Sequence, residues 1–381
     1  MTTRLGDFVG IGALIPTAYA RSGDSVLGPA LLLATPALTA LLLSTFGSGW
    51  LGRQEPRNGL VKVQLLGAFG LSLPLLHNSL WALVAAALVF GLVRTAYASL
   101  QAAYVSSFPD ELTGRYYGTA GTASASLELV GYVTGAGLAL AIGLGPALAL
   151  DISTFMLAAL LLSRLPAITQ TITRRHGHGI TGWATIRRSR ALRPYIVGLL
   201  GFAALSNLPE TLISGAVGSH KALLPIGLAL ASAGTAIGAT VAGRTNDGSQ
   251  PFVQLLAIGA GSLMAVFGPF GLLPGYFVIG LGLGWVAGAQ GAVVRLVPGP
   301  HVSAVMAILT AGLLVTEGLG TLIVGVLATT LGLTTAFITA TFAIVLIVTA
   351  STVLWQRSGP RAVLAGESST AQPASVPAVA A

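Results

Sequence analysis

Long apolar stretches, separated by short groups of glycine, proline and charged residues, run along almost the whole chain. Twelve of them approach the roughly 20 residues that a helix needs to cross a bilayer. They lack the alternation of apolar and polar residues that membrane barrels show, so we expect helices. The expected spans are 7–20, 26–46, 59–76, 80–103, 116–140, 147–165, 195–217, 222–243, 252–273, 276–296, 303–328 and 333–355.

The composition supports a protein embedded in lipid. Of the 381 residues, 54% are hydrophobic and only 8% are charged, whereas soluble domains carry about 25% charged residues. A chain with so few charges cannot cover a surface that faces water. The net charge of +8 would suggest a nucleic-acid partner in a soluble protein. Here basic loops explain it, and we expect no nucleic acid to bind.

The basic residues predict the orientation. If the N-terminus is cytoplasmic, every Lys and Arg except Arg21, Lys221 and Arg94 falls on the cytoplasmic side. This matches the excess of positive charge that cytoplasmic loops carry. We therefore expect a multi-pass protein with both termini in the cytoplasm. Alternatively, Arg4 and the apolar stretch to Ala20 form a cleavable signal peptide, although Asp7 and Pro16 interrupt it.

The second half of the chain repeats the first. A shift of 189 residues aligns Glu128 with Glu317 and Gln101 with Gln290 without a gap, and slightly larger shifts pair Arg53 with Arg244 and Thr17 with Glu210. Equivalent spans start on the same side of the membrane, so the repeat is parallel. Such repeats place the substrate path between two six-helix halves, near the bilayer midplane.

The repeat predicts four segments. We expect a six-helix bundle over residues 1–165, a basic cytoplasmic linker over 166–194, a second six-helix bundle over 195–356, and a disordered cytoplasmic tail over 357–381. The tail is rich in Ala, Ser and Pro, as disordered segments are. The linker is either a plain connection or, around residues 183–193, a short basic helix on the membrane surface.

Four stretches resemble a known family: LGDFVGIGALIP (5–16), SFPDELTGRYYG (107–118), GPALALDISTFMLAALLLSRLP (145–166) and TGWATIRRSRALRPYI (181–196). The chain resembles the major facilitator superfamily, in particular its enterobactin-exporter-like (secretion effector) branch. This resemblance implies an all-α membrane fold of two six-helix bundles in the cytoplasmic membrane of a bacterium. It also implies proton-coupled export of a small amphipathic molecule, such as a drug, siderophore or secondary metabolite.

The sequence departs from the family in its gating loop. Gly47, Arg53 and Arg57 fit the glycine-led basic motif between the second and third helices, and Arg244 is its counterpart in the second half. The Asp that usually accompanies the motif is missing, which puts the cytoplasmic gate of the family in doubt. The first helix also starts about ten residues later than in the family, so either Met1 is a misassigned start or the helix is short.

Charged residues within the spans are the candidates for transport chemistry, because a charge in the bilayer costs several kcal/mol unless it is paired or hydrated. Glu128 and Glu317 lie roughly 18 Å along their helices, close to the midplane. They either exchange protons and contact substrate or hold neighbouring helices together by hydrogen bonds.

Two further charges accompany the glutamate pair. Arg94 either pairs with Glu128 or extends toward lipid phosphates. Glu210 follows Pro209 in a span that we expect to be kinked, and it faces either the cavity or its outer mouth. The polar residues expected to line the cavity are Gln101, Gln290, Asn207 and Thr17.

The sequence carries no motif for enzymatic chemistry or a cofactor. It has no phosphate-binding loop, metal cluster or nucleophile triad, and His176 and His178 lie in a basic loop that is a poor metal site. We therefore expect a transporter without a cofactor that acts as a monomer on a small molecule, with protons as the coupling ion and lipids around it. The alternatives are a facilitator or sensor without proton coupling, and a lipid transporter of the same fold.

Overall fold

The computed structural model describes residues 2–43, 55–77, 79–105, 127–128, 130–166, 184–218, 220–244, 252–297 and 302–358, and these are almost entirely helical. The expected all-α architecture is confirmed. In chain order the helices are α1 (Thr2–Arg21), α2 (Leu27–Leu42), α4 (Pro56–Leu76), α5 (Leu80–Val105), the helix Val130–Ile142, α7 (Leu144–Ser163), α9 (Leu192–Ser206), α10 (Leu208–Ala216), α11 (Leu223–Arg244), η2 (Val253–Leu255), α12 (Leu256–Ala265), α13 (Pro269–Leu283), α14 (Trp285–Leu296), α15 (Val302–Leu331) and α16 (Leu333–Ser358).

These helices are apolar enough to lie in a membrane. Among the described residues, seven stretches are long and apolar enough to cross a bilayer, and four shorter apolar helices accompany them. The α9–α10 pair forms one of these stretches, Leu192–Ala216. Together with α1, these helices correspond to the twelve expected spans. Large apolar side chains such as Phe270 and Trp81 point outward, as they do in proteins that face lipid rather than water.

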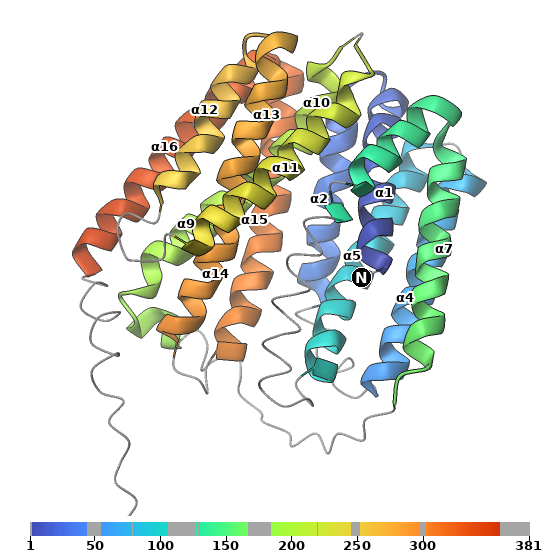
Figure 1. Cartoon of the computed structure of the whole chain (residues 1–381), viewed down its shortest axis with the longest axis horizontal. Coiled ribbons are helices and arrows are strands. Elements are labelled where there is room, and N and C mark those ends of the chain that lie inside the picture. Colours follow the sequence, from blue (N-terminus) through green and yellow to red (C-terminus); the bar gives the residue numbers. More distant parts are fainter. Residues whose placement is uncertain are drawn as a thin grey trace, which may run out of the picture.

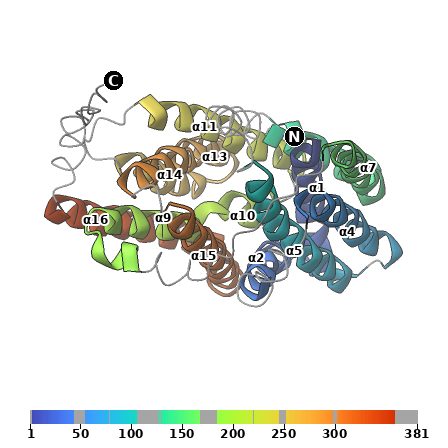
Figure 2. The same ribbon diagram turned by 90° about the horizontal axis from the view of Figure 1, so that it is seen from below.

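The helices lie in two side-by-side groups (Figures 1 and 2). The first group extends from α1 to α7 and the second from α9 to α16. The chain runs up and down, so that α1, α4, the helix Val130–Ile142, α10, α12 and α15 all end at the upper end in Figure 1. The sequence predicts that this upper end faces the outside.

The two groups share one packing pattern. In the first group α4 packs against α5 and α7, and α1 packs against α7. In the second group α12 packs against α13 and α16, and α9 packs against α16. These are the pairs that a parallel repeat requires, so the repeat inferred from the sequence is confirmed. The exact domain boundaries stay predictions, and residues 359–381 of the expected tail lie outside the described residues.

One expected boundary is wrong. We placed the ninth and tenth spans at 252–273 and 276–296, but α12 ends at Ala265 and α13 begins at Pro269. The turn is made by Gly268, whose φ of 72° lies in the left-handed region that glycine adopts readily. Proline then occupies the first helical turn, where its missing N–H costs nothing. Pro274, which falls in the gap between the two expected spans, lies inside α13.

The second group contains the expected kink and a second break. The span expected at 195–217 divides at Asn207 into α9 and α10. The tenth span divides at Gly284 into α13 and α14. A Cβ added at Gly280 or Gly284 would overlap the backbone of α11, so these glycines permit α13 to pack closely against α11.

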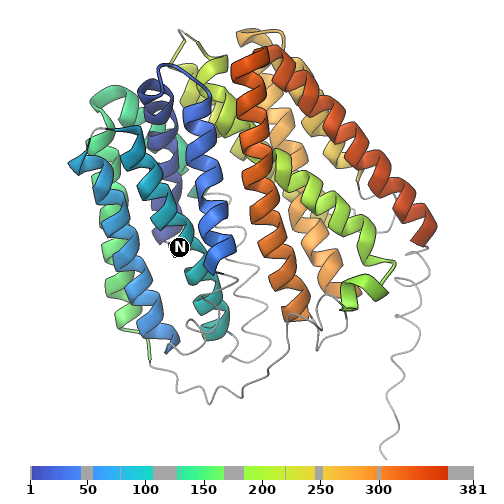
Figure 3. The same cartoon turned by 180° about the vertical axis from the view of Figure 1, so that it is seen from behind.

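The two groups meet most closely near the upper end, where α2 lies along α15 (Figure 3). Val26 faces Gly215, Ala30 faces Gly325, and Ala37 faces Gly318. We call these three contacts the upper seam. Buried side chains from both groups join in one apolar cluster there, which includes Ile15, Val26, Leu212 and Val324.

Below the upper seam, α15 contacts a helix of its own group. Gly312 of α15 faces Leu200 of α9, within its own group. On α2, Leu38 directly follows the seam residue Ala37 and is 61% exposed, and Leu42 is 55% exposed. Among the described glycines of α15, Gly318 and Gly325 contact α2.

Candidate functional site

The break at Asn207 places Glu210 at the start of a helix. Pro209 lies in the first turn of α10 and Glu210 follows it. The N-terminus of a helix carries partial positive charge, which favours a carboxylate at this position. The Pro209 carbonyl accepts a hydrogen bond from the buried Tyr276 hydroxyl at 3.1 Å, so a backbone group at the break finds a partner inside the protein, as a membrane requires.

Glu210 is hydrogen-bonded across the interface between the two groups. The Tyr132 hydroxyl, from the first group, donates to Glu210 Oε1 at 2.9 Å. The Tyr132 ring is buried and packs against Phe8 of α1 with ring centroids 5.3 Å apart. Glu210 Oε2 is also buried, and no residue that the structure describes donates a hydrogen bond to it. A buried carboxylate oxygen without a donor is costly while ionised and is a natural position for a proton.

The other predicted charges lie within electrostatic range of this hydrogen bond. Glu128 and Glu317 both act electrostatically on Glu210. Glu128 and Arg94, which carry opposite charges, act electrostatically in opposite senses on the Tyr132 hydroxyl. In addition, Glu128 Oε1 accepts a hydrogen bond from Ser232 of α11 at 3.4 Å, which again joins the two groups.

The structure therefore brings four predicted site residues together. We call Glu128, Glu210 and Glu317, with Arg94 and Tyr132, the carboxylate cluster. The three glutamates are half-buried and Arg94 is exposed. Three acidic side chains and one guanidinium leave the cluster net negative when all are ionised. Ionised carboxylates at short range repel one another strongly where water is scarce.

Asn207 connects the helix break to α15 beside Glu317. Its side-chain amide donates to the Thr321 hydroxyl at 3.4 Å, and that hydroxyl donates to the Glu317 carbonyl at 2.7 Å. The Asn207 carbonyl accepts from the Thr211 hydroxyl at 2.6 Å. Asn207 is thus well placed to transmit a change at the break to the helix that carries Glu317.

The remaining predicted cavity residues lie away from this cluster or outside the description. The Thr17 hydroxyl donates to the Ala13 carbonyl of its own helix at 2.8 Å. Gln101 is half-buried on α5, two turns below Arg94. The side chain of Gln290 lies outside the described residues.

The predicted gating residues are only partly described. Arg57 donates to the Leu165 carbonyl at 3.1 Å and to the Asn58 side chain at 3.2 Å. It therefore ties the start of α4 to the end of α7, within the first group, rather than joining the two groups. Gly47 and Arg53, and the side chain of Arg244, lie outside the described residues.

Sequence reasoning missed three residues of the site. Tyr132, Ser232 and Tyr276 supply the hydroxyls that contact the carboxylates and the helix break. One signal was present for Tyr132, because it lies four residues after Glu128 and therefore on the same helix face. Nothing in the local sequence distinguishes Ser232 or Tyr276 from other residues of their spans.

Comparisons with known proteins identify the fold. No protein-family model and no curated protein matches the chain. A point mutant of the nucleoside transporter NupG superposes with a TM-score of 0.72 at 12% identity, covering 93% of this chain and 98% of that one. NupG without the mutation gives a TM-score of 0.67 at 12% identity, covering 93% of this chain and 99% of its own.

A human protein gives a similar result. The organic anion transporter MFSD10 (TETRAN) has a TM-score of 0.66 at 15% identity, covering 93% of this chain and 98% of its own. These proteins have the major facilitator fold, and the chain shares it. None of the three is an enterobactin exporter by name, so the resemblance to that branch stays a prediction.

Proposed function

We propose that this protein is a secondary active transporter that exports a small amphipathic molecule in exchange for protons. The observation that carries the proposal is the carboxylate cluster, which straddles the interface between the two helix groups. In this proposal it resides as a monomer in the cytoplasmic membrane of a bacterium, with both termini in the cytoplasm. It catalyses no covalent reaction and requires no cofactor.

Alternating access would use the interface between the two helix groups. The upper seam is packed, and with the predicted orientation we take this as a state closed to the outside. Rocking the two groups about the carboxylate cluster would separate the upper seam and close the lower half.

The carboxylate cluster links this movement to protons. The closed upper seam brings Glu128 of the first group close enough to act on Glu210 of the second group, so ionising both opposes this state through repulsion. Protonation relieves the repulsion and stabilises the closed seam, and loss of protons favours its opening. A proton taken up outside would therefore return the transporter to the cytoplasm-facing state, which is the order that export by antiport requires.

Two alternatives make different use of the same fold. A facilitator or sensor would lack proton coupling, and it is favoured by Arg57, which is held within its own helix group instead of in a gate between the groups. A lipid transporter would open sideways between the groups toward the bilayer. In either alternative function, the buried Glu210 Oε2, which finds no hydrogen-bond donor among the described residues, would have no role in transport.

Flux through proteoliposomes distinguishes these functions. Ethidium is a suitable first probe, with fluorescein and a fluorescent phospholipid for comparison, because an acidic cluster favours an amphipathic cation. We expect ethidium flux to follow an imposed proton gradient and to move protons in the opposite direction. Flux that is unchanged when the gradient is collapsed would indicate a facilitator, and movement of the phospholipid alone would indicate a lipid transporter.

A further inference from the structure

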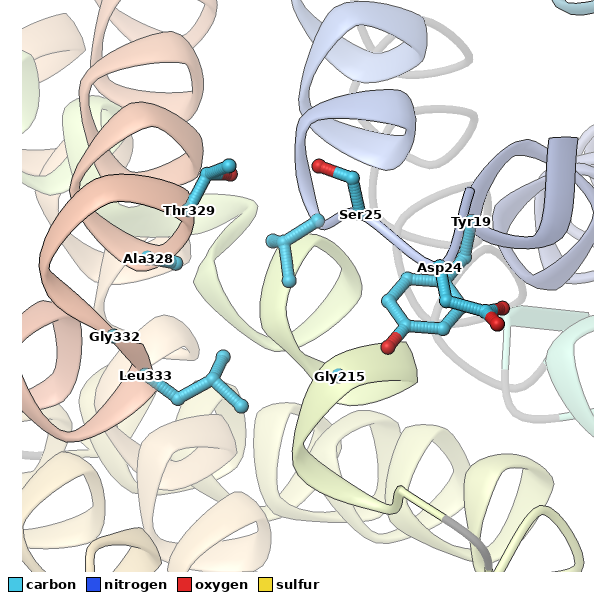
Figure 4. A pocket seen from close by; sticks show the side chains of 9 residues that line it. Tyr19, Asp24, Ser25, Gly215, Ala328, Thr329, Gly332 and Leu333 are labelled. Carbon is cyan, nitrogen blue, oxygen red and sulfur yellow. The ribbon is translucent and has the colours of Figure 1, made fainter. Parts of the chain in front are cut away.

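A pocket of about 400 Å³ lies at the upper end, where the two helix groups meet. Tyr19, Asp24 and Val26 line it from the first group, and Thr329 and Leu333 line it from the second. Figure 4 shows Tyr19 and Asp24 on one side of this space and Thr329 and Leu333 on the other. The pocket is separate from the carboxylate cluster and shares none of its residues. We call it the upper pocket.

The polar wall of the upper pocket carries negative charge. Asp24 is exposed at the rim, and its charge acts on the Tyr19 hydroxyl. Within the part of the chain that the structure describes, no basic side chain is recorded as an ion-pair partner of Asp24. The neighbouring Arg21 points elsewhere and donates to the Ser79 carbonyl at 3.1 Å.

The backbone at Asp24 is unusual. Its φ of 57° makes it the one residue other than glycine with a positive φ in the described residues. Asp is among the few residues that tolerate this conformation, and outliers of this kind gather at functional sites. The turn presents the carboxylate at the rim of the pocket instead of in a helix.

The rest of the lining is mostly apolar, apart from the hydroxyls of Ser25 and Thr329. Val26, Ala328 and Leu333 supply hydrocarbon surface, and Gly215 and Gly332 supply no side chain that would fill the space. A ligand that suits both parts of the lining has a positively charged end near Asp24 and the Tyr19 ring and an apolar body.

We propose that the upper pocket is a regulatory site for a small amphipathic organic amine, whose binding holds the upper seam closed. Both helix groups contribute its walls, so the complete pocket exists only while the seam is closed. A ligand that binds one of two states shifts the population toward that state. The amine would therefore inhibit transport from a site apart from the carboxylate cluster. The inhibitory consequence rests on the proposed function, whereas the binding site does not.

Phenethylamine tests the binding site on the purified full chain, with 2-phenylethanol and phenylacetate as neutral and anionic controls. We expect phenethylamine to bind severalfold more tightly than either control, because an ion pair at an exposed carboxylate contributes up to about fivefold. Asp24→Asn keeps a residue that tolerates positive φ and should remove most of this preference. Thr334→Asn, at an exposed position next to the pocket, should leave it unchanged. Equal binding of all three probes, or an unchanged preference in Asp24→Asn, would overturn the site.

A cysteine placed toward the lower end of α15 tests whether binding at the upper pocket regulates the transporter. The chain has no cysteine, so Thr310→Cys, at an exposed position in the lower part of α15, gives a single thiol roughly 28 Å along the helix from Thr329. We expect phenethylamine to increase maleimide labelling of this thiol at least twofold at mildly alkaline pH, by holding the lower half open. Binding that leaves the labelling unchanged would disprove regulation. Binding that depends on Asp24 in a protein without gradient-driven flux would instead contradict only the proposed function.

Discussion

Replacing Glu210 by Gln is expected to lower gradient-driven flux at least tenfold while the protein stays folded. Gln has the same shape and its oxygen can still accept the hydrogen bond from Tyr132, which is 2.9 Å long in the native protein. It cannot bind and release a proton, so a step that depends on this exchange loses its driving force. Proteoliposomes loaded with a pH-sensitive dye and supplied with ethidium measure both fluxes together.

The matched control is Glu55→Gln. Glu55 caps α4 by accepting from the backbone N–H of Arg57 at Oε1 and of Asn58 at Oε2, and the single Gln oxygen can keep one of these bonds. This variant removes a carboxylate outside the cluster and should transport at close to the native rate. If Glu210→Gln showed gradient-driven flux at the native rate, Glu210 would have no part in proton coupling.

The second large effect is expected from Gly325→Leu in the upper seam. A Cβ at this position would overlap the Ala30 side chain of α2, and overpacking of this kind costs about 1–3 kcal/mol. The two helix groups can relieve it by separating at the upper end. We therefore expect the equilibrium to shift toward the open seam by roughly tenfold or more, with a corresponding loss of flux.

Labelling of a cysteine at Val26 measures this shift. Val26 is buried and faces Gly215 across the seam, so Val26→Cys should react with maleimide only while the seam is open. Gly325→Leu should speed the reaction about tenfold. Gly137→Leu, whose added Cβ would meet nothing within 4 Å, should not. A thiol that stays equally protected in Gly325→Leu would mean that the seam does not open by separation of α2 from α15.

Most of the fold could be predicted from the sequence, because apolar runs of membrane length leave few alternatives to helices. The sequence repeat also predicted that the helices form two groups, since one shift along the chain aligns Glu128 with Glu317. The turn before Pro269 was missed because Pro269 and Pro274 lie close together and either proline could mark the boundary between the two helices. A proline inside an apolar span is compatible with a helix in a membrane, and the left-handed φ of Gly268 that decides between them is not visible in composition.

The candidate site could be predicted only in part, for a related reason. A charge within a span is conspicuous in sequence, so Glu128, Glu210 and Glu317 were found. Their partners are ordinary residues whose role depends on contacts between the helix groups: Tyr132 reaches Glu210 from 78 positions away. The sequence indicates which residues need a partner, but the tertiary packing determines which partner each one has.

The most direct test of the account is the pH dependence of access to the two ends. The maleimide labelling rates of Val26→Cys and Thr310→Cys are measured across mildly acidic to mildly alkaline pH. Each rate is divided by that of Thr334→Cys, an exposed thiol, which corrects for ionisation of the thiol itself. The account predicts that raising the pH speeds labelling at Val26→Cys and slows it at Thr310→Cys, and that Glu210→Gln reduces both responses. Labelling that is independent of pH at both ends, or that responds identically in Glu210→Gln, would contradict it.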